Sequence, residues 1–237
     1  MKMRKLVRRL GTLLMVAGAA LLLWVVVVWQ WQDPFTALYT KYKQHQLAGA
    51  YAKRAKEFPF TKFAADASLA TMSHEIAAEA RRYRKKSKRG QAIGRIRVHR
   101  LGLNMILVNG TDHGSLTKGP GRDLRTYMPG EGQLVYIAGH RTTYLAPFAH
   151  IERMRRGDDI TLELPYATFH YAVMSHRVVP ADDVSRLKSH GREVVVLQAC
   201  HPRFFATHRY LVYGRPVRVE PRGGPTYKIA RGALVPS

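Results

Sequence analysis

Cysteine is almost absent from this sequence, because Cys200 is the only one among 237 residues. One cysteine cannot form a disulfide within the chain, and structural zinc sites that need two to four cysteines are excluded as well. An unpaired thiol is either a small buried hydrophobic side chain or a free reactive group. Cys200 follows the apolar run 194–197 and is therefore the first residue to explain.

Acidic residues are also scarce. Asp and Glu total 16 against 39 Lys and Arg, so the formal net charge is +23 and the pI is about 10.6. Such a charge favours an anionic partner, which includes nucleic acid, phospholipid headgroups and acidic polymers. A highly charged, solvated surface without a specific partner is the alternative. The chain has no internal repeat, and its length fits one mid-sized domain with accessory segments.

Only one long apolar run is present. Residues 11–29 carry no charge over 19 positions, close to the ~20 that a helix needs to span hydrocarbon. Basic residues precede the run and tryptophans lie near its far end, namely Lys2, Arg4, Lys5, Arg8, Arg9, Trp24, Trp29 and Trp31. Positive charge marks the cytoplasmic side and tryptophan the interface. We therefore predict a single-pass cell-membrane protein, with a cytoplasmic end over 1–10, a transmembrane anchor over 11–31 and an extracytoplasmic remainder.

A cleaved signal peptide is the alternative to this anchor. Its apolar core is shorter and is followed by a small-x-small cleavage site. Here the sequence Trp-Gln-Trp-Gln-Asp-Pro follows instead, which favours an anchor that is retained.

Residues 32–90 read as an extracytoplasmic linker. Helical composition predicts helices over about 36–57 and 61–86, but neither shows a strong apolar stripe, so we expect a stalk that packs weakly. The segment 81–89 holds seven basic residues in nine positions. It is either a self-repelling, disordered linker, which we favour, or an adhesive patch for an anionic leaflet or wall polymer. Nucleic acid is disfavoured, because the segment lies outside the cell and has little aromatic interleaving.

After Gly90 the pattern changes from helical to strand-like. The expected strands are 93–98, 104–108, 134–138, 160–164, 168–179, 194–199 and 210–219. A long loop is expected over 110–132, with short helical segments at 146–155 and 181–188. Many short strands with brief helices predict a mainly β domain, a closed or nearly closed barrel over 91–220. A flexible tail is expected over 221–237.

Several phrases within 91–220 carry a specific resemblance. They are Ser-Leu-Thr-Lys-Gly-Pro-Gly (115–121), Ala-Gly-His-Arg-Thr-Thr-Tyr (138–144), Gly-Asp-Asp-Ile (157–160), Val-Leu-Gln-Ala-Cys (196–200) and His-Arg (208–209). In order and spacing they resemble the sortases, cysteine transpeptidases of Gram-positive cell surfaces, and most of all the class E housekeeping sortases of actinobacteria. The resemblance implies a closed eight-stranded sortase-type β-barrel with short helices.

The residues that carry this resemblance suit amide chemistry. A thiolate is a strong nucleophile, an imidazole can exchange protons with it and with a departing amine, and a guanidinium can stabilise charge on the attacked oxygen. By resemblance, Cys200 is the nucleophile, His140 the general acid and base, and Arg209 the group that positions substrate and stabilises the oxyanion. The resemblance implies no metal and no organic cofactor.

Two metal hypotheses compete with this interpretation. Cys200, His201 and His208 could suggest zinc, but their spacing matches no standard finger and a fourth ligand is missing. Asp182 and Asp183 could invite calcium, but adjacent carboxylates at a helix start more often cap it.

The substrate-binding residues are expected near the histidine and the cysteine. Pockets are expected from 141–148 and 178–192, with Tyr144 and Arg141 as candidate contacts. At Ala199 the chain departs from the family, whose members commonly carry a threonine before the cysteine. That threonine would contact substrate, so Ala199 is counted as a substrate-binding position with an altered contact. Arg122 also stands where relatives often carry histidine.

The resemblance implies cleavage of a C-terminal sorting motif, Leu-Ala-x-Thr-Gly or Leu-Pro-x-Thr-Gly, between Thr and Gly. An amine on a peptidoglycan precursor would then accept the acyl group, so the expected partners are exported motif-bearing proteins, that amine and the membrane. One alternative is a pilin-polymerising sortase with a lysine acceptor, since Asp33-Pro34-Phe35 resembles the lid motif of such enzymes. Another is a non-catalytic, membrane-tethered binder of anionic wall polymers.

Overall fold

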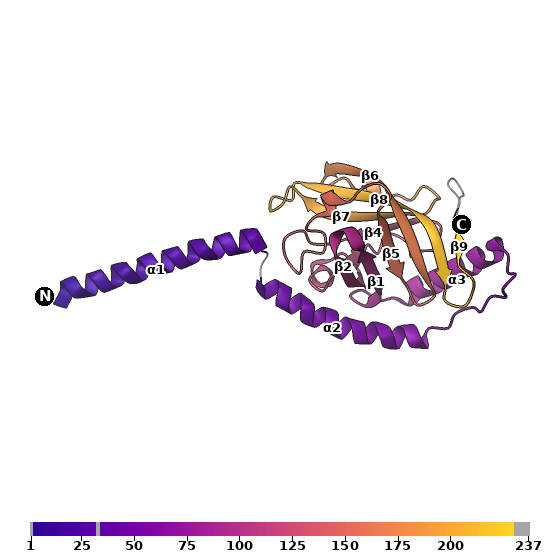
Figure 1. The fold of residues 1–237 in the computed structure, drawn as a ribbon, viewed down its shortest axis with the longest axis horizontal. Coiled ribbons are helices and arrows are strands. Elements are labelled where there is room, and N and C mark those ends of the chain that lie inside the picture. The colour runs from indigo at the N-terminus through magenta and orange to yellow at the C-terminus, as the bar shows by residue number, and fades with distance from the viewer. Residues whose placement is uncertain (1, 32–33, 230–237) are drawn as a thin grey trace.

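The computed structural model describes residues 2–31 and 34–229. Helix α1 (Lys2–Trp31) projects away from the rest of the molecule, and helix α2 (Pro34–Glu57) runs along one side of the barrel (Figure 1). Within α1, Met3–Val27 is long and apolar enough to cross a membrane. The predicted anchor over 11–31 therefore falls inside a helix that also includes the basic residues before it.

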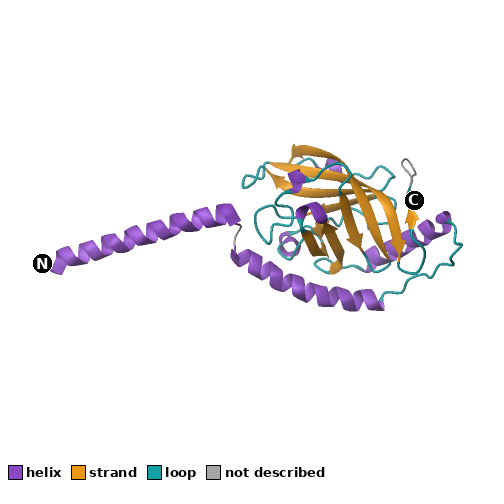
Figure 2. Ribbon diagram, viewed as in Figure 1, coloured by secondary structure: helices purple, strands orange, loops and turns teal. Residues whose placement is uncertain are grey.

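Eight strands close into a barrel (Figure 2). They are β1 (Ala92–Val98), β2 (Leu103–Asn109), β3 (Gly121–Arg122), β4 (Leu134–Ala138), β5 (Asp159–Glu163), β6 (Ala167–Pro180), β7 (Val194–His201) and β8 (His208–Pro221). Their order is β6-β5-β1-β2-β3-β4-β7-β8, and pairing of β6 with β8 completes the ring. A ninth short strand, β9 (Tyr227–Lys228), pairs with β8 outside the ring. The prediction of a mainly β, eight-stranded closed barrel is confirmed.

Strand β3 is the one barrel strand that the sequence did not predict. It has two residues and lies in the expected loop 110–132, where it pairs with β2 and β4. A Cβ on Gly121 would lie 2.0 Å from the carbonyl oxygen of Gly110, so only glycine allows this close approach. Arg122 follows with its side chain fully buried, and its guanidinium donates to the side chain of Asn109. The buried guanidinium of Arg122 therefore holds this segment from inside the barrel.

The barrel wall has two apolar faces in the region of β7. Val195, Leu197 and Ala199 belong to the main core inside the barrel. Val196, between them, belongs to a smaller cluster on the outer face, which also contains Leu134 and Tyr136 of β4, Leu211 of β8 and Val179 of β6. The alternation follows from the two-residue period of a strand. It fixes which side chains of β7 face out of the barrel.

The expectation of a weakly packed stalk is wrong for helix α3 (Leu69–Lys86). Ile76, Ala80 and Tyr83 are buried in the same core as the strands, and the hydroxyl of Tyr83 donates to the carbonyl of Ile93 at 2.9 Å. The helix begins later than the expected residue 61, because Ser68 caps it by accepting from the backbone of Thr71.

The basic segment 81–89 is correspondingly not a disordered linker over its first two turns. Residues 81–86 continue α3, and the guanidinium of Arg84 bonds the buried carboxylate of Glu131 at 2.8 Å. Tyr83 on one side of the helix is buried, while Arg82, Lys85 and Lys86 on other sides are exposed to solvent.

Helix α2 also lies on the barrel, along β1 and β2 (Figure 1). Its contacts are mostly polar. The hydroxyl of fully buried Thr40 donates to the carbonyl of Thr117 at 2.8 Å, the amide of Gln44 bonds the backbone of Ile106, and the hydroxyl of Tyr51 donates to the carbonyl of Glu163. Because these contacts need no apolar stripe, the hydrophobic pattern did not reveal them.

The segment after β8 is ordered as far as it is described. β9 pairs with β8, and Tyr227 and Ile229 pack against the core. The expectation of a flexible tail is therefore wrong for 221–229, and residues 230–237 of the predicted tail lie outside the described part.

Short helical elements connect the strands. They are η1 (His99–Leu101), α4 (His113–Leu116), η2 (Ile151–Arg153) and η3 (Val184–Leu187). The helical segments expected at 146–155 and 181–188 are thus single turns within those ranges.

Candidate active site at one end of the barrel

Three adjacent strands bring the three predicted catalytic residues to one end of the barrel. β4 and β7 are parallel, with Ala138 opposite Gln198, and the amide of Gly139 continues the ladder by donating to the carbonyl of Gln198 at 3.0 Å. His140 therefore leaves β4 level with Cys200 on β7. Neighbouring strands lie about 4.8 Å apart. This register brings His140 and Cys200 to neighbouring positions, although 60 residues separate them in the sequence.

Arg209 reaches the site from the other side of β7. It is the direct cross-strand partner of Cys200 in the antiparallel pair of β7 with β8. Its guanidinium donates to the carbonyls of Ala206 at 2.8 Å and His208 at 3.0 Å, both in the hairpin that joins the two strands. Cys200 is a free, partly buried thiol between the histidine and arginine strands.

The outer face of the barrel carries Cys200. Ala199 points into the core and is fully buried beside Leu197, so its neighbour Cys200 points outward, in phase with Val196. The prediction that Ala199 contacts substrate is therefore wrong. A side chain at that position packs inside the barrel and has no access to a peptide on the outer face.

His140 sits where the chain has left the strand. A Cβ on Gly139 would lie 2.7 Å from the ring of Phe148, so glycine is required before the histidine for the chain to pass this buried ring. The imidazole lies against the Tyr144 ring, with centroids 4.9 Å apart and the planes tilted by 39°, and its Nε2 is buried without a hydrogen-bond partner in the described structure. Burial lowers the pKa of His140, and the charge of nearby His113 lowers it further.

The loop after His140 has an uncommon backbone. Tyr144, Leu145 and Ala146 all have positive φ, at 54°, 61° and 36°, a region that side chains other than glycine rarely adopt. Hydrogen bonds hold the loop, and one of them joins it to a distant part of the sequence: the amide of Tyr144 donates to the hydroxyl of Thr36 at 3.1 Å. Such strain persists only where the surroundings enforce it and is frequent at functional sites. Tyr144, predicted as a substrate contact, is partly exposed here beside the imidazole.

That bond also brings the start of α2 to the site. Thr36 follows directly on Pro34 and Phe35, the described part of the segment that resembles a lid motif. The sequence placed this segment far upstream of the barrel, yet in space it lies against the histidine loop.

Arg141 is buried, with a side chain only 6% exposed. Its guanidinium donates to the carbonyl of Cys200 at 3.1 Å and to the Nδ1 of His201 at 3.0 Å, and it pairs with the Glu152 carboxylate at 2.8 Å. The prediction of a substrate contact at Arg141 does not fit this arrangement, because the side chain is buried and both terminal nitrogens of its guanidinium are engaged by the protein. Instead, Arg141 connects the backbone of the cysteine to the η2 turn.

The sequence did not single out Glu152, which completes this connection, or His113. Arg141 lowers the pKa of His201 in addition to the effect of desolvation, and it lowers that of Glu152 against its burial. His201 faces the ring of Tyr210, whose hydroxyl meets the Nδ1 of His176 at 3.0 Å. Nothing in the spacing of these residues along the chain indicated that they would meet.

The metal hypotheses find no support in the described residues. Over 2–31 and 34–229, no group of three or more His, Cys, Asp or Glu side chains is arranged to hold a metal ion. His201 is engaged by Arg141, and His208 by Thr207. The carboxylate of Asp183 caps η3 by accepting from the backbone of Ser185 at 3.1 Å, the role that the sequence favoured for it.

A family model described as a sortase domain matches residues 96–217. Sortase D of Bacillus subtilis (strain 168) is 32% identical over 136 residues, which cover 56% of this chain and 67% of the relative. Sortase SrtE1 of Streptomyces coelicolor is 32% identical over 110 residues, which cover 42% of this chain but only 31% of that protein.

Solved structures agree with these relatives. The crystal structure of sortase E1 from Streptomyces coelicolor, with a tripeptide in its active site, superposes with a TM-score of 0.53 at 26% identity, over 56% of this chain and 92% of that one. A sortase D5 transpeptidase of Clostridium perfringens superposes with a TM-score of 0.59 at 20% identity, over 74% of this chain and 99% of that one. The latter similarity concerns the fold alone.

Proposed function

This chain belongs to the sortase family of cysteine transpeptidases, and from that membership we propose that it is a membrane-anchored enzyme that joins exported proteins to a cell-wall amine. Cys200 is its nucleophile, His140 its general acid and base, and Arg209 the cation that positions substrate and stabilises the oxyanion. The observation that carries the proposal is the register of β4, β7 and β8, which sets the cysteine between the other two residues.

The proposed reaction has two steps. In the first, the Cys200 thiolate attacks the carbonyl carbon of the motif threonine, the threonine–glycine C–N bond breaks, and protonated His140 gives its proton to the departing amine. In the second, the acceptor amine attacks the thioester, His140 takes up the amine proton, and the Cys200 thiolate leaves. Atoms and charge balance without a metal or a redox partner.

The surroundings of the two proton-carrying groups support these roles. The Nε2 of His140 is buried and has no partner among the described residues, so this nitrogen can form a hydrogen bond with a group of the bound substrate. Burial lowers the pKa of His140, so the free imidazole is neutral near pH 7; it takes its proton from the Cys200 thiol as the thiolate forms and then gives that proton to the departing amine. The guanidinium of Arg209 spends only part of its five donors on hairpin carbonyls.

Arg141 has a positioning role in this proposal. It is buried and bonds the carbonyl of Cys200, so it holds the backbone that carries the thiol and does not touch substrate. Tyr144 remains the proposed substrate contact near the second residue of the motif, since its ring borders His140 and is partly exposed.

The finer features of the proposal are the motif, the acceptor and the membrane. We assign Leu-Ala-x-Thr-Gly or Leu-Pro-x-Thr-Gly as the motif and a peptidoglycan precursor as the acceptor. α1 is the single-pass anchor, with its basic end in the cytoplasm, which follows the positive-inside tendency of Lys2–Arg9. Because the family consists of enzymes, a non-catalytic binder of wall polymers is disfavoured.

One observation favours a second candidate function. The Pro34–Phe35 segment leads into Thr36, which contacts the histidine loop, so the lid-like sequence lies beside the proposed site. A pilin-polymerising sortase, which uses a lysine side chain as acceptor, would be consistent with that placement. The acceptor amine separates the two candidates.

The test uses the full chain in detergent micelles with each motif peptide and either a wall-precursor amine or a lysine-containing pilin peptide. Wild type should form a Cys200-linked acyl adduct by mass spectrometry and transfer it to the precursor amine. Cys200→Ala and His140→Ala should form none, whereas His99→Ala, a change at an exposed histidine of η1, should behave as wild type. A native chain that forms no adduct with any peptide of a broad library would sink the proposal. Transfer to the pilin lysine alone would favour the second candidate.

A further inference from the structure

The β7–β8 hairpin exposes two aromatic rings that have no role in the proposed reaction. Phe205 is 77% exposed and Phe204 54% exposed, whereas Phe58, Phe63, Phe148 and Phe169 lie in or against the core; Phe35, at the start of α2, is exposed as well. The guanidinium of Arg203 lies 5.9 Å from the ring of Phe204. An exposed aromatic pair next to a cation is the composition of a segment that inserts shallowly at a lipid interface.

The tip that carries these rings has a fixed shape. Phe204 and Ala206 both have positive φ, at 73° and 53°, although neither is glycine. The amide of Ala206 donates to the carbonyl of Pro202 at 3.2 Å, and the carbonyl of Ala206 accepts from Arg209. A hairpin that holds unfavourable backbone angles in order to present two apolar rings to solvent points to a binding surface.

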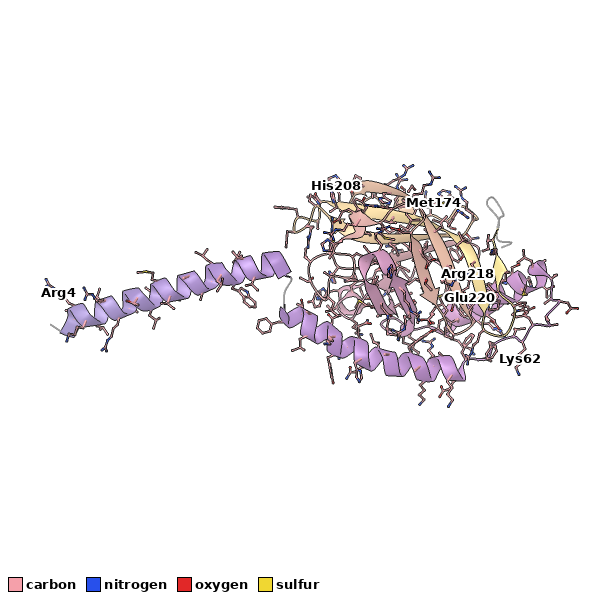
Figure 3. The ribbon with its side chains drawn as sticks, viewed as in Figure 1. Arg4, Lys62, Met174, His208, Arg218 and Glu220 are labelled. Atoms are coloured by element: carbon pink, nitrogen blue, oxygen red, sulfur yellow. The ribbon has the colours of Figure 1, made fainter. Side chains whose placement is uncertain are left out.

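The hairpin lies at the same end of the molecule as the exit of α1. His208, at the start of β8, lies on the side of the barrel that faces α1, while Lys62 is at the opposite end (Figure 3). Thr36 follows the last residue of α1 by five positions, which span at most about 18 Å of extended chain. The bond from Tyr144 to Thr36 then ties the histidine loop to that short tether.

Arg141 connects the histidine loop to the β7–β8 hairpin. The residue belongs to the same loop as Tyr144, and it bonds the carbonyl of Cys200 and the ring of His201, from which the hairpin departs. The site end of the barrel is thereby held near the surface of any bilayer that α1 spans. The strong positive charge of the chain suits anionic headgroups at that surface.

We propose that the hairpin tip, Phe204 and Phe205 with Arg203, docks into the headgroup region of the bilayer that holds α1. This second attachment fixes the barrel with its proposed active site next to the membrane, where a membrane-held acceptor or substrate would arrive. The proposal rests on the anchoring part of the proposed function. A sorting-motif peptide is the competing occupant, and the test separates it from lipid.

The single native cysteine makes a site-specific probe practical. In a Cys200→Ala background, Thr207→Cys places a fluorescent bimane beside the two rings, and Lys62→Cys places it at the far end of the molecule, where the side chain is exposed. Each full chain is reconstituted into vesicles of phosphatidylcholine and phosphatidylglycerol, with or without nitroxide-labelled acyl chains as quencher. Alkaline extraction reports separately whether α1 is inserted.

The quencher lipid should reduce the emission at position 207 at least about twofold and leave position 62 unchanged. Adding Phe204→Ser and Phe205→Ser should abolish the quenching at 207. Absence of quenching at 207, equal quenching at 62, or quenching that survives the serine changes would each overturn the proposal. So would a response of the 207 probe to a motif peptide in detergent without lipid, which would assign the rings to substrate.

Failure of the premise looks different. A chain that alkaline treatment extracts would refute the anchor, and the hairpin proposal with it. A retained chain without quenching would refute only the hairpin. Adduct formation by the native chain tests the chemistry independently of both.

Discussion

Arg141 allows a direct choice between a substrate contact, expected from the sequence, and a positioning role, indicated by the structure. The test changes are Arg141→Ala and Arg141→Lys. The first removes the donors to the carbonyl of Cys200, to His201 and to Glu152. The second keeps the charge but loses the planar fork that serves several acceptors at once.

The expected loss of stability follows from burial. Breaking a buried ion pair costs about 3–5 kcal/mol when the remaining charge stays buried. Glu152 is 39% exposed, so its carboxylate regains contact with water when Arg141 is removed, and the contribution of the ion pair must be reduced accordingly. The lost hydrogen bond to the Cys200 carbonyl adds to the cost. We therefore expect Arg141→Ala to lower the free energy of unfolding by about 2–3 kcal/mol. For a chain of this size, that corresponds to a fall in Tm of about 5–10 °C. Thermal unfolding in detergent micelles measures it.

The kinetic expectation separates the two roles. If Arg141 holds the backbone of Cys200, kcat should fall about 10- to 100-fold, because small misplacements of a reacting atom are costly, and KM for the peptide should change little. Arg141→Lys should recover part of kcat. A pure stability effect would not shift the pKa of His201, whereas loss of the adjacent guanidinium should raise it, as histidine NMR titration can show.

The matched control is Arg153→Ala, which removes an exposed arginine from the same turn as Glu152. It should leave Tm, kcat and KM as in wild type. A large rise of KM with unchanged kcat in Arg141→Ala would instead assign Arg141 to substrate and refute the reasoning from its burial.

Three further predictions concern groups around the barrel. His113→Gln should raise the pKa of His140, because it removes a charge that lowers it, and the acid limb of the activity profile should move to higher pH; NMR titration that shows no rise would contradict this. Burial raises the pKa of Glu193 from 4.5 to about 7, so its contribution is complete below pH 4.5 and is lost as the pH rises to about 7. That loss amounts to about 3 kcal/mol, and Glu193→Gln should flatten the urea-unfolding stability over this interval, whereas an unchanged slope would argue against the shift. Ile76→Ala should lower the free energy of unfolding by about 2–4 kcal/mol, because α3 packs in the core. A loss near zero would instead support a weakly packed stalk.

The sequence was most informative where strands are apolar on both faces of the barrel wall. β4, β7 and β8 were predicted close to their observed bounds, because their apolar residues face the core on both sides of the wall. β3 was missed, because two residues carry no periodicity and its place depends on the close approach of Gly121 to Gly110. The stalk was misjudged for a related reason, since α2 contacts the barrel through polar groups such as Thr40.

The error at Ala199 has a different origin. Ala199 and Cys200 are consecutive in a strand, so they must face opposite sides. Assigning both to one groove conflicts with the alternation that already placed Val196 and Leu197 on different faces. The alternation was therefore sufficient to place Ala199 in the core. By contrast, the pairing of Arg141 with Glu152 depends on the path of an irregular loop, which no periodic pattern describes.

The same distinction between ladder and loop divides the proposed active site. Cys200 and Arg209 are held by the backbone ladder of β7 and β8, in which five residue pairs precede Cys200 and one follows it. His140 lies past the end of β4, in a loop whose position depends on Arg141 and on the bond of Tyr144 to Thr36. The proposed nucleophile, Cys200, and the proposed oxyanion cation, Arg209, are thus fixed by the sheet, whereas the position of the His140 imidazole depends on contacts of its loop with other parts of the chain. The bond of Tyr144 to Thr36 links this loop to the start of α2, five residues after the end of α1, whereas the described backbone ladder alone holds Cys200 against Arg209.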